Sequence, residues 1–501
     1  MFKTIFSFEF KRWIKNWQFY LYAAIFFFLG LLLMGSSLGY FDALTVTTTS
    51  LTKMNSPLMI SVMIEGVNQL LYFLFPTIIG AAIYRDYKYN MHQIFYSYPF
   101  TKTNYLLGKF LSAFLITFII SLLIGLGMFV ATLLPFANPD LLGPNVFWNY
   151  AQAYLINVIP NMLLIGVIVF AITTLTRSIY VGFAAVIAII IILGVVSSLT
   201  GNMENEILGI LLDPTGMAAL EYYTKYWTID EFNTSNLPVE KWYLVNRAIW
   251  LGIAFIFAGV LYRLFRFSEQ GLTWRFGKRK KSERITKANL VGLHRIVLPK
   301  VSYDFSLKSR WNNVWNFMRL DFKALVSNRV FLILVGIGII SMILIGAFAN
   351  IMFGAKTLPV TSDMVSMLQG AFHIFIIANT FLGAGLLIHR GQISKMDGLV
   401  DATPTPNWVF FASKFFALIL MQVVLLGVVI LGGVLIQSYA GYYQFELGLY
   451  LKNLIGISLI QYVIWAGLAM AVQTLFKNYI VGFFVLILFF LFGDRYSALG
   501  V

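Results

Sequence analysis

The sequence predicts an all-α polytopic membrane protein of about eleven spans, arranged as two parallel pseudo-repeats of about six transmembrane helices, the second incomplete. Of its 501 residues, 59% are hydrophobic and only 11% are charged, whereas soluble domains are about 45–50% apolar and about 25% charged. The apolar residues gather in runs near the roughly 20 residues that cross a bilayer core. Several stretches of the first half recur in the second. This composition excludes a soluble enzyme, a disordered tail and a fibrous repeat.

The predicted spans follow one another along the chain with short polar connections. A basic segment, Met1–Trp17, precedes the first run in place of a signal-peptide cleavage pattern. Its aromatic residues are interspersed with Lys and Arg, which predicts a helix lying in the membrane interface, and Trp311–Val326 has the same character. The predicted spans are Phe19–Gly39, Met59–Ile83, Phe110–Leu134, Tyr154–Leu175, Tyr180–Leu199, Trp250–Phe265, Val330–Met352, Gly370–His389, Val409–Ile436, Leu454–Leu475 and Ile480–Phe492.

The distribution of charge fixes the expected orientation. With the N-terminus in the cytoplasm, 29 of the 36 Lys and Arg residues fall in cytoplasmic segments. This asymmetry is the positive-inside pattern of helical membrane proteins. It accounts for the net charge of +15 without nucleic acid, and we expect the basic residues to contact lipid headgroups.

The internal repeat is visible at three places. Residues 173–183 align with residues 473–483, and Glu9 aligns with Asp321. A third alignment, at a constant offset of 305, pairs Arg85, Met91, Pro99 and Lys109 with Arg390, Met396, Pro404 and Lys414. Duplications of this kind are typical of transporters. Because six predicted spans, an even number, precede the second copy, the two copies have the same orientation, which excludes an inverted repeat.

These patterns divide the chain into three parts. Residues 1–266 form a first transmembrane unit, with an interfacial helix at 1–17, six spans and outside helices within 200–245. Residues 267–310 form a basic cytoplasmic linker, and residues 311–501 form a second unit that stops after its fifth span. The C-terminus is then expected outside, or the chain is a fragment of a longer protein, which is the favoured expectation.

Two cytoplasmic loops are candidate coupling elements. Tyr84–Lys109 and His389–Lys414 each contain a short polar helix followed by proline, which breaks a helix at the membrane surface. Such a helix can transmit a rigid-body movement from a soluble partner to two spans. An ordinary amphipathic connector is the alternative, and the recurrence in both halves favours coupling. The candidate residues are Arg85, His92, Pro99, Lys102, Lys109, Arg390, Lys395, Asp397, Pro404 and Lys414.

A polar cluster inside the membrane is a second candidate site. Glu65, Asn68 and Gln69 lie in the second predicted span, and an intramembrane carboxylate indicates function by default. Glu65 is expected near the outer end of that span, within reach of water, so a pathway or gate role competes with a solvated position. Outside, two short helices are expected around Asp213–Gly216, either as a cap over an exit path or as a loop resting on headgroups.

Other chemistry is excluded by what the sequence lacks. There is no cysteine and there are only four histidines, none spaced as a helical zinc motif. No GxxxxGK[ST] loop is present, so this chain cannot hydrolyse ATP through a P-loop. We therefore expect no catalytic residues, no metal ligands and no cofactor bound by this chain.

The order of elements resembles the permease of an ABC-2 type (type V) ABC exporter, as two permease units in tandem. The stretch Tyr98–Lys109 is similar to that family's sequence after its coupling helix, although Asn90-Met91-His92 stands where the family often has Glu and a Gly-Thr pair. Asn90-Met91-His92, Asp213-Pro214-Thr215-Gly216 and Tyr223–Thr228 are similar to the membrane half of bacterial fusions between such a permease and an M1-type aminopeptidase. No peptidase domain is present in these residues, so no protease activity is expected.

The resemblance implies a multi-pass protein of the bacterial inner membrane that moves a lipid-like, peptide or other amphipathic substrate by alternating access. P-loop ATPase subunits at the cytoplasmic face would bind ATP and Mg²⁺, and membrane lipids and a peptidase domain or subunit are the other expected partners. Two alternatives remain: a secondary carrier with parallel six-span repeats, for which Glu65 would be essential, and a membrane scaffold of a peptidase-linked complex. The scarcity of midplane carboxylates argues against the carrier.

Overall fold

The computed structural model describes residues 1–40, 52–200, 206–267, 304, 306–348, 351–352, 355–356, 358–394, 396–476 and 479–493. These residues are mainly α-helical, with one antiparallel pair of two-residue strands, β1 (Ile351–Met352) and β2 (Ala355–Lys356). Most of the predicted linker, residues 268–303, lies outside the described residues, and so do Lys395 and residues 494–501.

Seven helical segments of the described residues are long and apolar enough to cross a membrane, which makes the chain a multi-pass membrane protein. They are α2 (Trp17–Ser37), α6 (Lys102–Leu133), α7 (Phe147–Gln152) continued by η3 (Ala153–Val158) and α8 (Ile159–Thr176), α13 (Lys241–Leu264), α16 (Thr361–Ser394), α18 (Asn407–Tyr439), and α19 (Leu447–Tyr450) continued by η5 (Leu451–Ser458) and α20 (Leu459–Leu475).

Two further helix pairs are long and apolar enough only when taken together, and each pair is bent at a short break. α3 (Pro57–Tyr72) is followed by η2 (Pro76–Gly80) and α4 (Ala81–Lys88) at 43°, and α14 (Leu307–Val326) meets α15 (Arg329–Phe348) at 62°. Counting each bent pair as one span gives up to nine in the described residues, and the shorter apolar windows of α9 (Ile179–Thr200) and α21 (Tyr479–Gly493) cover the other two predicted runs. Every predicted span therefore overlaps a helix, although Val330–Met352 extends past the end of α15 to β1, and seven to nine rather than eleven of the described helical segments meet the length and composition of a span.

The break in the second span has a local cause. Pro76 follows the end of α3 and has no N–H to continue the hydrogen-bond ladder of the helix. The chain continues as a π-helix, η2, before the regular turns of α4. The hydroxyl of Thr77 donates to the carbonyl oxygen of Leu74 at 2.8 Å and so binds one backbone acceptor beside the break.

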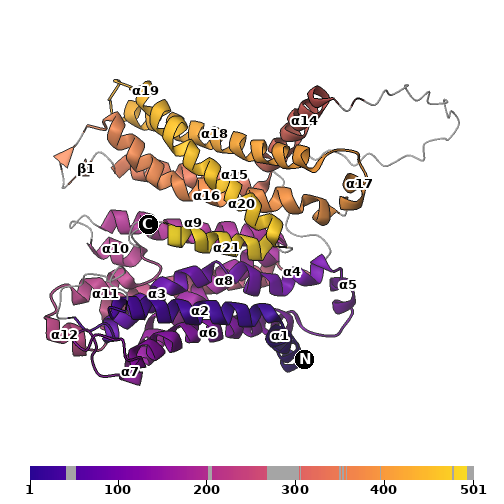
Figure 1. The fold of residues 1–501 in the computed structure, drawn as a ribbon. Coiled ribbons are helices and arrows are strands. Elements are labelled where there is room, and N and C mark those ends of the chain that lie inside the picture. Colours follow the sequence, from indigo (N-terminus) through magenta and orange to yellow (C-terminus); the bar gives the residue numbers. More distant parts are fainter. Residues whose placement is uncertain are drawn as a thin grey trace.

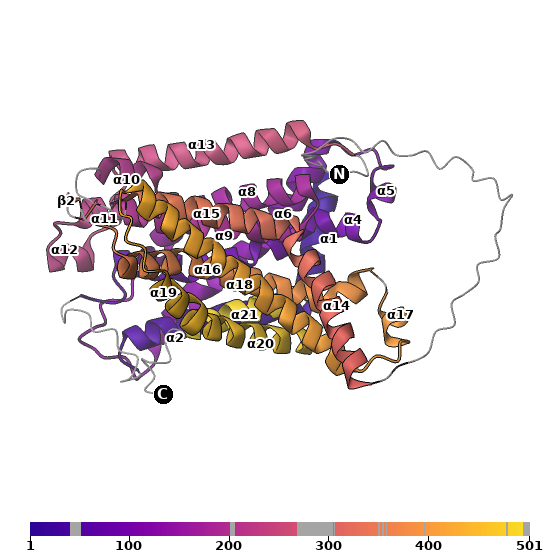
Figure 2. The same ribbon diagram turned by 90° about the horizontal axis from the view of Figure 1, so that it is seen from above.

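The helices form two layers that run in the same general direction (Figure 1). α2, α3, α6 and α8 belong to the lower layer and α15, α16, α18 and α20 to the upper one, with α9 and α21 between them. One end of the molecule, here the proximal end, carries α1 (Phe2–Ile14), α5 (His92–Phe95), α14 and α17 (Asp397–Asp401) (Figures 1 and 2). The opposite, distal end carries α7, α19, α10 (Glu206–Leu212), α11 (Met217–Thr224) and α12 (Ile229–Thr234).

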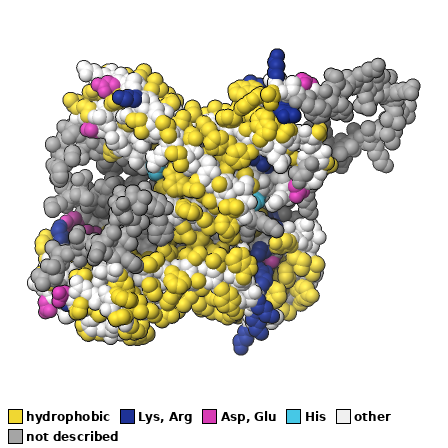
Figure 3. Space-filling view, in the orientation of Figure 1, with side chains coloured by type: hydrophobic (Ala, Val, Ile, Leu, Met, Phe, Trp, Pro, Cys, Tyr) yellow, Lys and Arg dark blue, Asp and Glu magenta, His cyan; other side chains and the backbone are white. Residues whose placement is uncertain are grey.

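The surface agrees with a membrane-spanning orientation of these layers. Hydrophobic side chains cover the middle of the face shown in Figure 3, and the visible charged side chains lie mainly toward the two ends. An apolar belt between two polar ends is the arrangement expected of a bundle whose solvent is a bilayer.

Glycines allow the backbones of two spans in the first layer to touch. A Cβ atom built on Gly30 of α2 would lie 2.2 Å from the carbonyl oxygen of Ile124 in α6. One built on Gly127 of α6 would lie 2.1 Å from the carbonyl oxygen of Phe27 in α2. Small residues that permit such close approach are a common basis of helix association in membranes.

The two layers meet along α9 and α21. The rings of Phe183 in α9 and Phe483 in α21 lie 4.6 Å apart between centroids. α21 also contacts the first layer, since the Tyr22 and Phe484 rings are 5.7 Å apart, while Ala184 and Ile187 of α9 cluster with Val330 of α15. The interface is therefore an apolar seam. α9 and α21, which form its centre, occupy corresponding places in the helix order of the two halves of the chain.

Candidate functional sites

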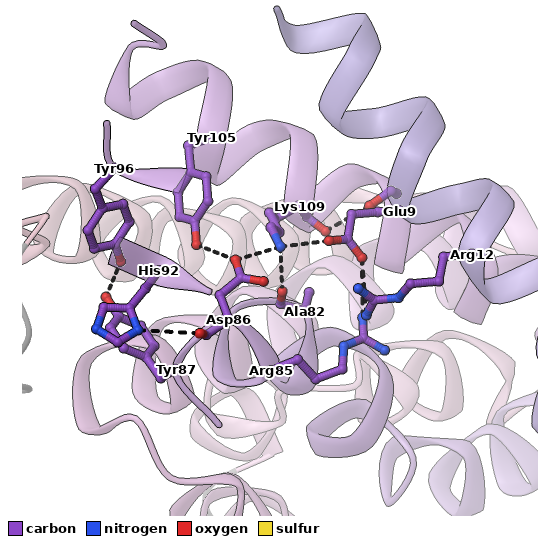
Figure 4. A network of polar contacts seen from close by, with 11 residues as sticks. Glu9, Arg12, Ala82, Arg85, Asp86, Tyr87, His92, Tyr96, Tyr105 and Lys109 are labelled. Atoms are coloured by element: carbon purple, nitrogen blue, oxygen red, sulfur yellow. Dashed lines mark hydrogen bonds and ion pairs between the residues drawn. The ribbon is translucent and has the colours of Figure 1, made fainter. Parts of the chain in front are cut away.

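A buried charged network lies at the proximal end of the first layer (Figure 4). It joins α1, α4 and the first turns of α6, and we call it the proximal network. Its members are Glu9, Arg12, Arg85, Asp86, Tyr105 and Lys109. The sequence brought Arg85 and Lys109 forward as coupling candidates, and the structure places both here.

Lys109 is the centre of the proximal network. Its Nζ lies 2.6 Å from Oε1 of Glu9 and 2.7 Å from Oδ2 of Asp86, and it donates to the carbonyl oxygen of Ala82 at 3.0 Å. Its side chain is only 4% exposed, and those of Glu9 and Asp86 are 2% and 5% exposed. An ammonium has three donors, and three oxygens lie within 3.0 Å of this one, as the burial of such a charge requires.

The two carboxylates receive further partners from separate elements. Glu9 Oε2 lies 3.3 Å from Arg85 Nη2 and 3.4 Å from Arg12 Nη2. Asp86 Oδ2 accepts a 2.7 Å hydrogen bond from the hydroxyl of Tyr105. The network thus fixes α1 and α4 to the first turns of α6.

His92 begins the short helix α5 and is buried beside the proximal network, where its ring packs against neighbouring aromatic rings. Its Nδ1 lies 3.3 Å from the carbonyl oxygen of Asp86, and its ring is 4.7 Å from that of Tyr87. The guanidinium of Arg177, at the end of α8, lies 4.0 Å from the Tyr87 ring. The start of α5 is therefore held against α4 and the end of the fourth span.

Pro99 and Lys102 do not join the proximal network. Pro99 is exposed in the segment before α6, and Thr101 begins that helix as its N-cap by accepting a hydrogen bond from the N–H of Asn104, as a stop and restart at these residues predicts. The Nζ of Lys102 lies 4.7 Å from the ring of Tyr262 in α13 instead.

The second layer carries a looser charged cluster at the same end. Arg390 Nη1 lies 3.2 Å from Oδ1 of Asp321, and the hydroxyl of Ser413 donates to Oδ2 of Asp321 at 3.4 Å. Lys414 is half-buried and acts electrostatically on the same carboxylate. Arg390 is 52% exposed, so this pair is far more accessible than the proximal network.

The remaining candidates of the second loop lie at the surface. Asp397 begins α17 and is exposed, and Pro404 is exposed in the turn before α18. Pro406 is the N-cap residue of α18. Lys395 falls outside the described residues.

Both proximal loops present apolar side chains to the outside. On α5 and its flank, Met91 is 43% and Ile94 is 56% exposed. On α17 and its flank, Met396 is 48% and Leu399 is 67% exposed. Each loop thus carries a pair of exposed apolar side chains at the proximal end of the molecule.

Glu65 is buried inside the first layer, so the expectation that water reaches it is wrong for this structure. The side chain is 1% exposed, and the hydroxyl of Tyr72 donates to its Oε1 at 2.7 Å. Asn68 is fully buried and accepts a 2.8 Å hydrogen bond from the hydroxyl of Ser121 in α6. Gln69 faces away from this pair and lines a cavity between the layers.

Glu65 adjoins a polar cluster built around Arg247 of α13. The Nη1 of Arg247 donates to Oδ1 of Asn161 at 2.6 Å, and its Nη2 donates to the carbonyl oxygen of Pro214 at 3.2 Å. Arg247 acts electrostatically on Glu65. The turn Asp213–Gly216 packs against the guanidinium so closely that a Cβ on Gly216 would lie 2.4 Å from Nη2. This arrangement ties the distal helices α10 and α11 to spans α3, α8 and α13.

Arg247, Asn161 and Asn246 belong to this site but are not predicted from the sequence. Asn246 joins it because its Oδ1 accepts a hydrogen bond from Nε of Arg247 at 2.9 Å. Arg247 was counted only as a basic residue outside the membrane, and it is 7% exposed. One signal was available, because Asn246-Arg247 stands at the start of an apolar run, where a buried cation needs a partner.

A cavity of about 110 Å³ lies between the two layers. Its lining comes from α3 and the C-cap residue Phe73, α9, α16 and α21, and it is apolar apart from Gln69. It is the place where the predicted pathway residue Gln69 meets the second layer, through Phe381 of α16 and Phe490 of α21.

No protein-family model and no curated protein sequence matches this chain.

Proposed function

We propose that this chain is the transmembrane permease of an ATP-driven ABC exporter, which moves a lipid-like, peptide or other amphipathic substrate by alternating access. The observation that carries the proposal is the pair of proximal helices, α5 and α17, with exposed apolar side chains at corresponding positions. Met91 and Ile94 align with Met396 and Leu399 at the same offset of 305, and all four protrude at one end of the molecule. Two equivalent docking points on one face suit a pair of ATPase subunits.

The contacts of the two layers support an internal repeat. Phe183 and Phe483, which align at an offset of 300, touch each other across the seam. α2 contacts α21 through Tyr22 and Phe484, and α15 contacts α9 through Val330. Reciprocal contacts of this kind are the mark of a two-fold, isologous interface.

Close approaches within each layer support the same repeat. Cβ atoms built on Gly80 and Gly182 would both meet the side chain of Thr173, at 2.8 and 2.4 Å. Cβ atoms built on Gly385 and Gly482 would both meet the side chain of Gln473, at 3.2 and 2.7 Å. Each residue of the first trio aligns with one of the second.

The charged clusters provide a route from docking to transport. Glu9, Arg85 and Lys109 align with Asp321, Arg390 and Lys414, and each set gathers at the proximal end of its layer. A push on α5 by an ATPase reaches α1, α4 and α6 through the proximal network as a rigid unit. Movement of the two layers then opens the cavity lined by α3, α9, α16 and α21 to one side or the other. ATP and Mg²⁺ bind the partner subunit in this scheme.

The experiment is purification of the chain from its native membranes with mass spectrometry of the proteins that accompany it. We expect a stoichiometric P-loop ATPase whose hydrolysis the chain stimulates, and loss of that stimulation in the double variant Ile94→Ser/Leu399→Ser. Leu307→Ser is the matched control, since Leu307 is 68% exposed at the same end and lies on neither α5 nor α17. If the double variant stimulated ATP hydrolysis fully, the assignment of α5 and α17 as coupling helices would be wrong. If no nucleotide-binding partner accompanied the chain, the proposed exporter function would be wrong.

The buried Glu65 and Arg247 favour a second candidate function, that of a secondary carrier. In that case transport follows an ion gradient without nucleotide, and Glu65→Gln abolishes it. A peptidase-linked scaffold, the third reading of the sequence, predicts no transport in either assay.

A further inference from the structure

A large apolar groove lies on the first layer, apart from the seam between the layers. It has a volume of about 380 Å³ and is formed by α6, α8 and α13. None of its lining residues lines the cavity at the seam. Its volume lies in the range of roughly 300–1,000 Å³ typical of small-molecule sites, and its walls include Leu107, Leu163 and Phe255.

The chemistry of the groove is asymmetric along its length. Its lining is aliphatic and aromatic except for Thr103 and the hydroxyl of Tyr262, both near the proximal end. Lys102 stands at that end, with its Nζ 4.7 Å from the Tyr262 ring and 5.9 Å from the Phe265 ring.

Lys102 has a positive charge that the described residues leave uncompensated. Among them, the ion pairs within 4.0 Å do not include Lys102. Arg263 and Arg266 directly follow Tyr262 and Phe265 in the sequence, at the end of α13 and just after it, and both are exposed, so this end of the helix carries further positive charge. The mouth of the groove is therefore cationic, while its body is apolar.

We propose that this groove is a binding site for an anionic phospholipid, with one acyl chain between α6, α8 and α13 and the headgroup phosphate at Lys102. In a bilayer an apolar groove on the outside of a bundle is filled by acyl chains, because no water is present to fill it. The cationic mouth selects among lipids, since basic side chains at a membrane surface attract anionic headgroups. The inference requires only that the chain spans a membrane and does not depend on the transport reaction.

The test is native mass spectrometry of the purified chain in detergent, titrated with phosphatidylglycerol or with phosphatidylcholine of the same acyl chains. One basic residue near an anionic lipid contributes about 1 kcal/mol, so we expect Lys102→Met to weaken phosphatidylglycerol binding about fivefold and to weaken phosphatidylcholine much less, because its choline cation offsets the charge of its phosphate. Lys102→Arg retains the charge and should retain binding. Lys88→Met is the matched control, because Lys88 also stands over a tyrosine ring, that of Tyr89, at the proximal end and lies outside the groove.

The acyl-chain half of the site has its own pair of variants. Ala258→Phe fills the groove and should weaken both lipids, whereas Val260→Phe, two residues along the same helix and outside the lining, should weaken neither. Inorganic phosphate at millimolar concentration should not displace the lipid. Displacement would indicate that Lys102 binds free anions and not a lipid headgroup. Equal binding of the two lipids by the wild type, or equal losses in Lys102→Met and Lys88→Met, would overturn the headgroup assignment. Undiminished lipid binding by Ala258→Phe would overturn the assignment of the acyl chain to this groove.

Discussion

Replacing the buried Lys109 by methionine is expected to be among the most destabilising single substitutions at the proximal end. The variant leaves Glu9 and Asp86, which are 2% and 5% exposed, without their shared cation. Removing one partner of a buried ion pair typically costs about 3–5 kcal/mol, because an uncompensated charge stays buried. Glu9 keeps two arginines and Asp86 keeps the Tyr105 hydroxyl, so we expect a loss of about 3 kcal/mol, at the lower end of that range.

The matched control is Arg390→Met in the second layer. Arg390 pairs with Asp321 at 3.2 Å but is 52% exposed, and exposed pairs contribute about 0.2–1 kcal/mol. The free energy of unfolding of both variants is measured by titrating the protein in mild-detergent micelles with dodecyl sulfate and following helix content by circular dichroism. The triple variant Glu9→Gln/Asp86→Asn/Lys109→Met removes the buried charges together and should regain part of the loss. A Lys109→Met loss no larger than that of Arg390→Met would refute the reasoning.

Three further predictions follow from local geometry. Gly127→Ala should cost about 1–3 kcal/mol of unfolding free energy, because its Cβ would lie 2.1 Å from a backbone oxygen of α2; Gly252→Ala, where a Cβ meets open space, should cost nothing in the same titration. Gly216→Ala should cost more than about 1 kcal/mol and loosen the distal helices in limited proteolysis, since Gly216 has φ +73° and adjoins Arg247; unchanged cleavage would contradict this packing. Hydrogen bonds from the N-cap residue of α12 lower the pKa of Glu231, so its stabilisation is present above the unfolded-state pKa and is lost as pH falls through the folded-state value. Hydrogen exchange over residues 228–234, corrected for its intrinsic pH dependence, should therefore accelerate in acid for the wild type and stay flat for Glu231→Gln.

The local features of this chain could be predicted from the sequence because they depend on neighbours along the chain. Apolar runs become helices in a bilayer, since only internal hydrogen bonding can satisfy their backbones, and each predicted run does overlap a helix. Thr101 begins α6 and Asp213–Gly216 separates α10 from α11, as capping and turn chemistry indicate. The membrane orientation, the internal repeat and the partners were inferred from charge counts, sequence alignment and the family resemblance. They stay predictions.

The sites were decided by contacts between residues that lie far apart in the sequence. Glu65 was recognisable as an intramembrane carboxylate, but Arg247 is 182 residues away and looked like an ordinary outside cation. Lys102 and Lys109 both looked like coupling residues, yet one faces an apolar groove and the other two buried carboxylates. On a helix, residues seven positions apart share a face, so periodicity cannot distinguish these two lysines. The packing of α1 and α4 against one part of that face, and of α13 against another, gives each its chemistry, and this packing exists only in the folded molecule.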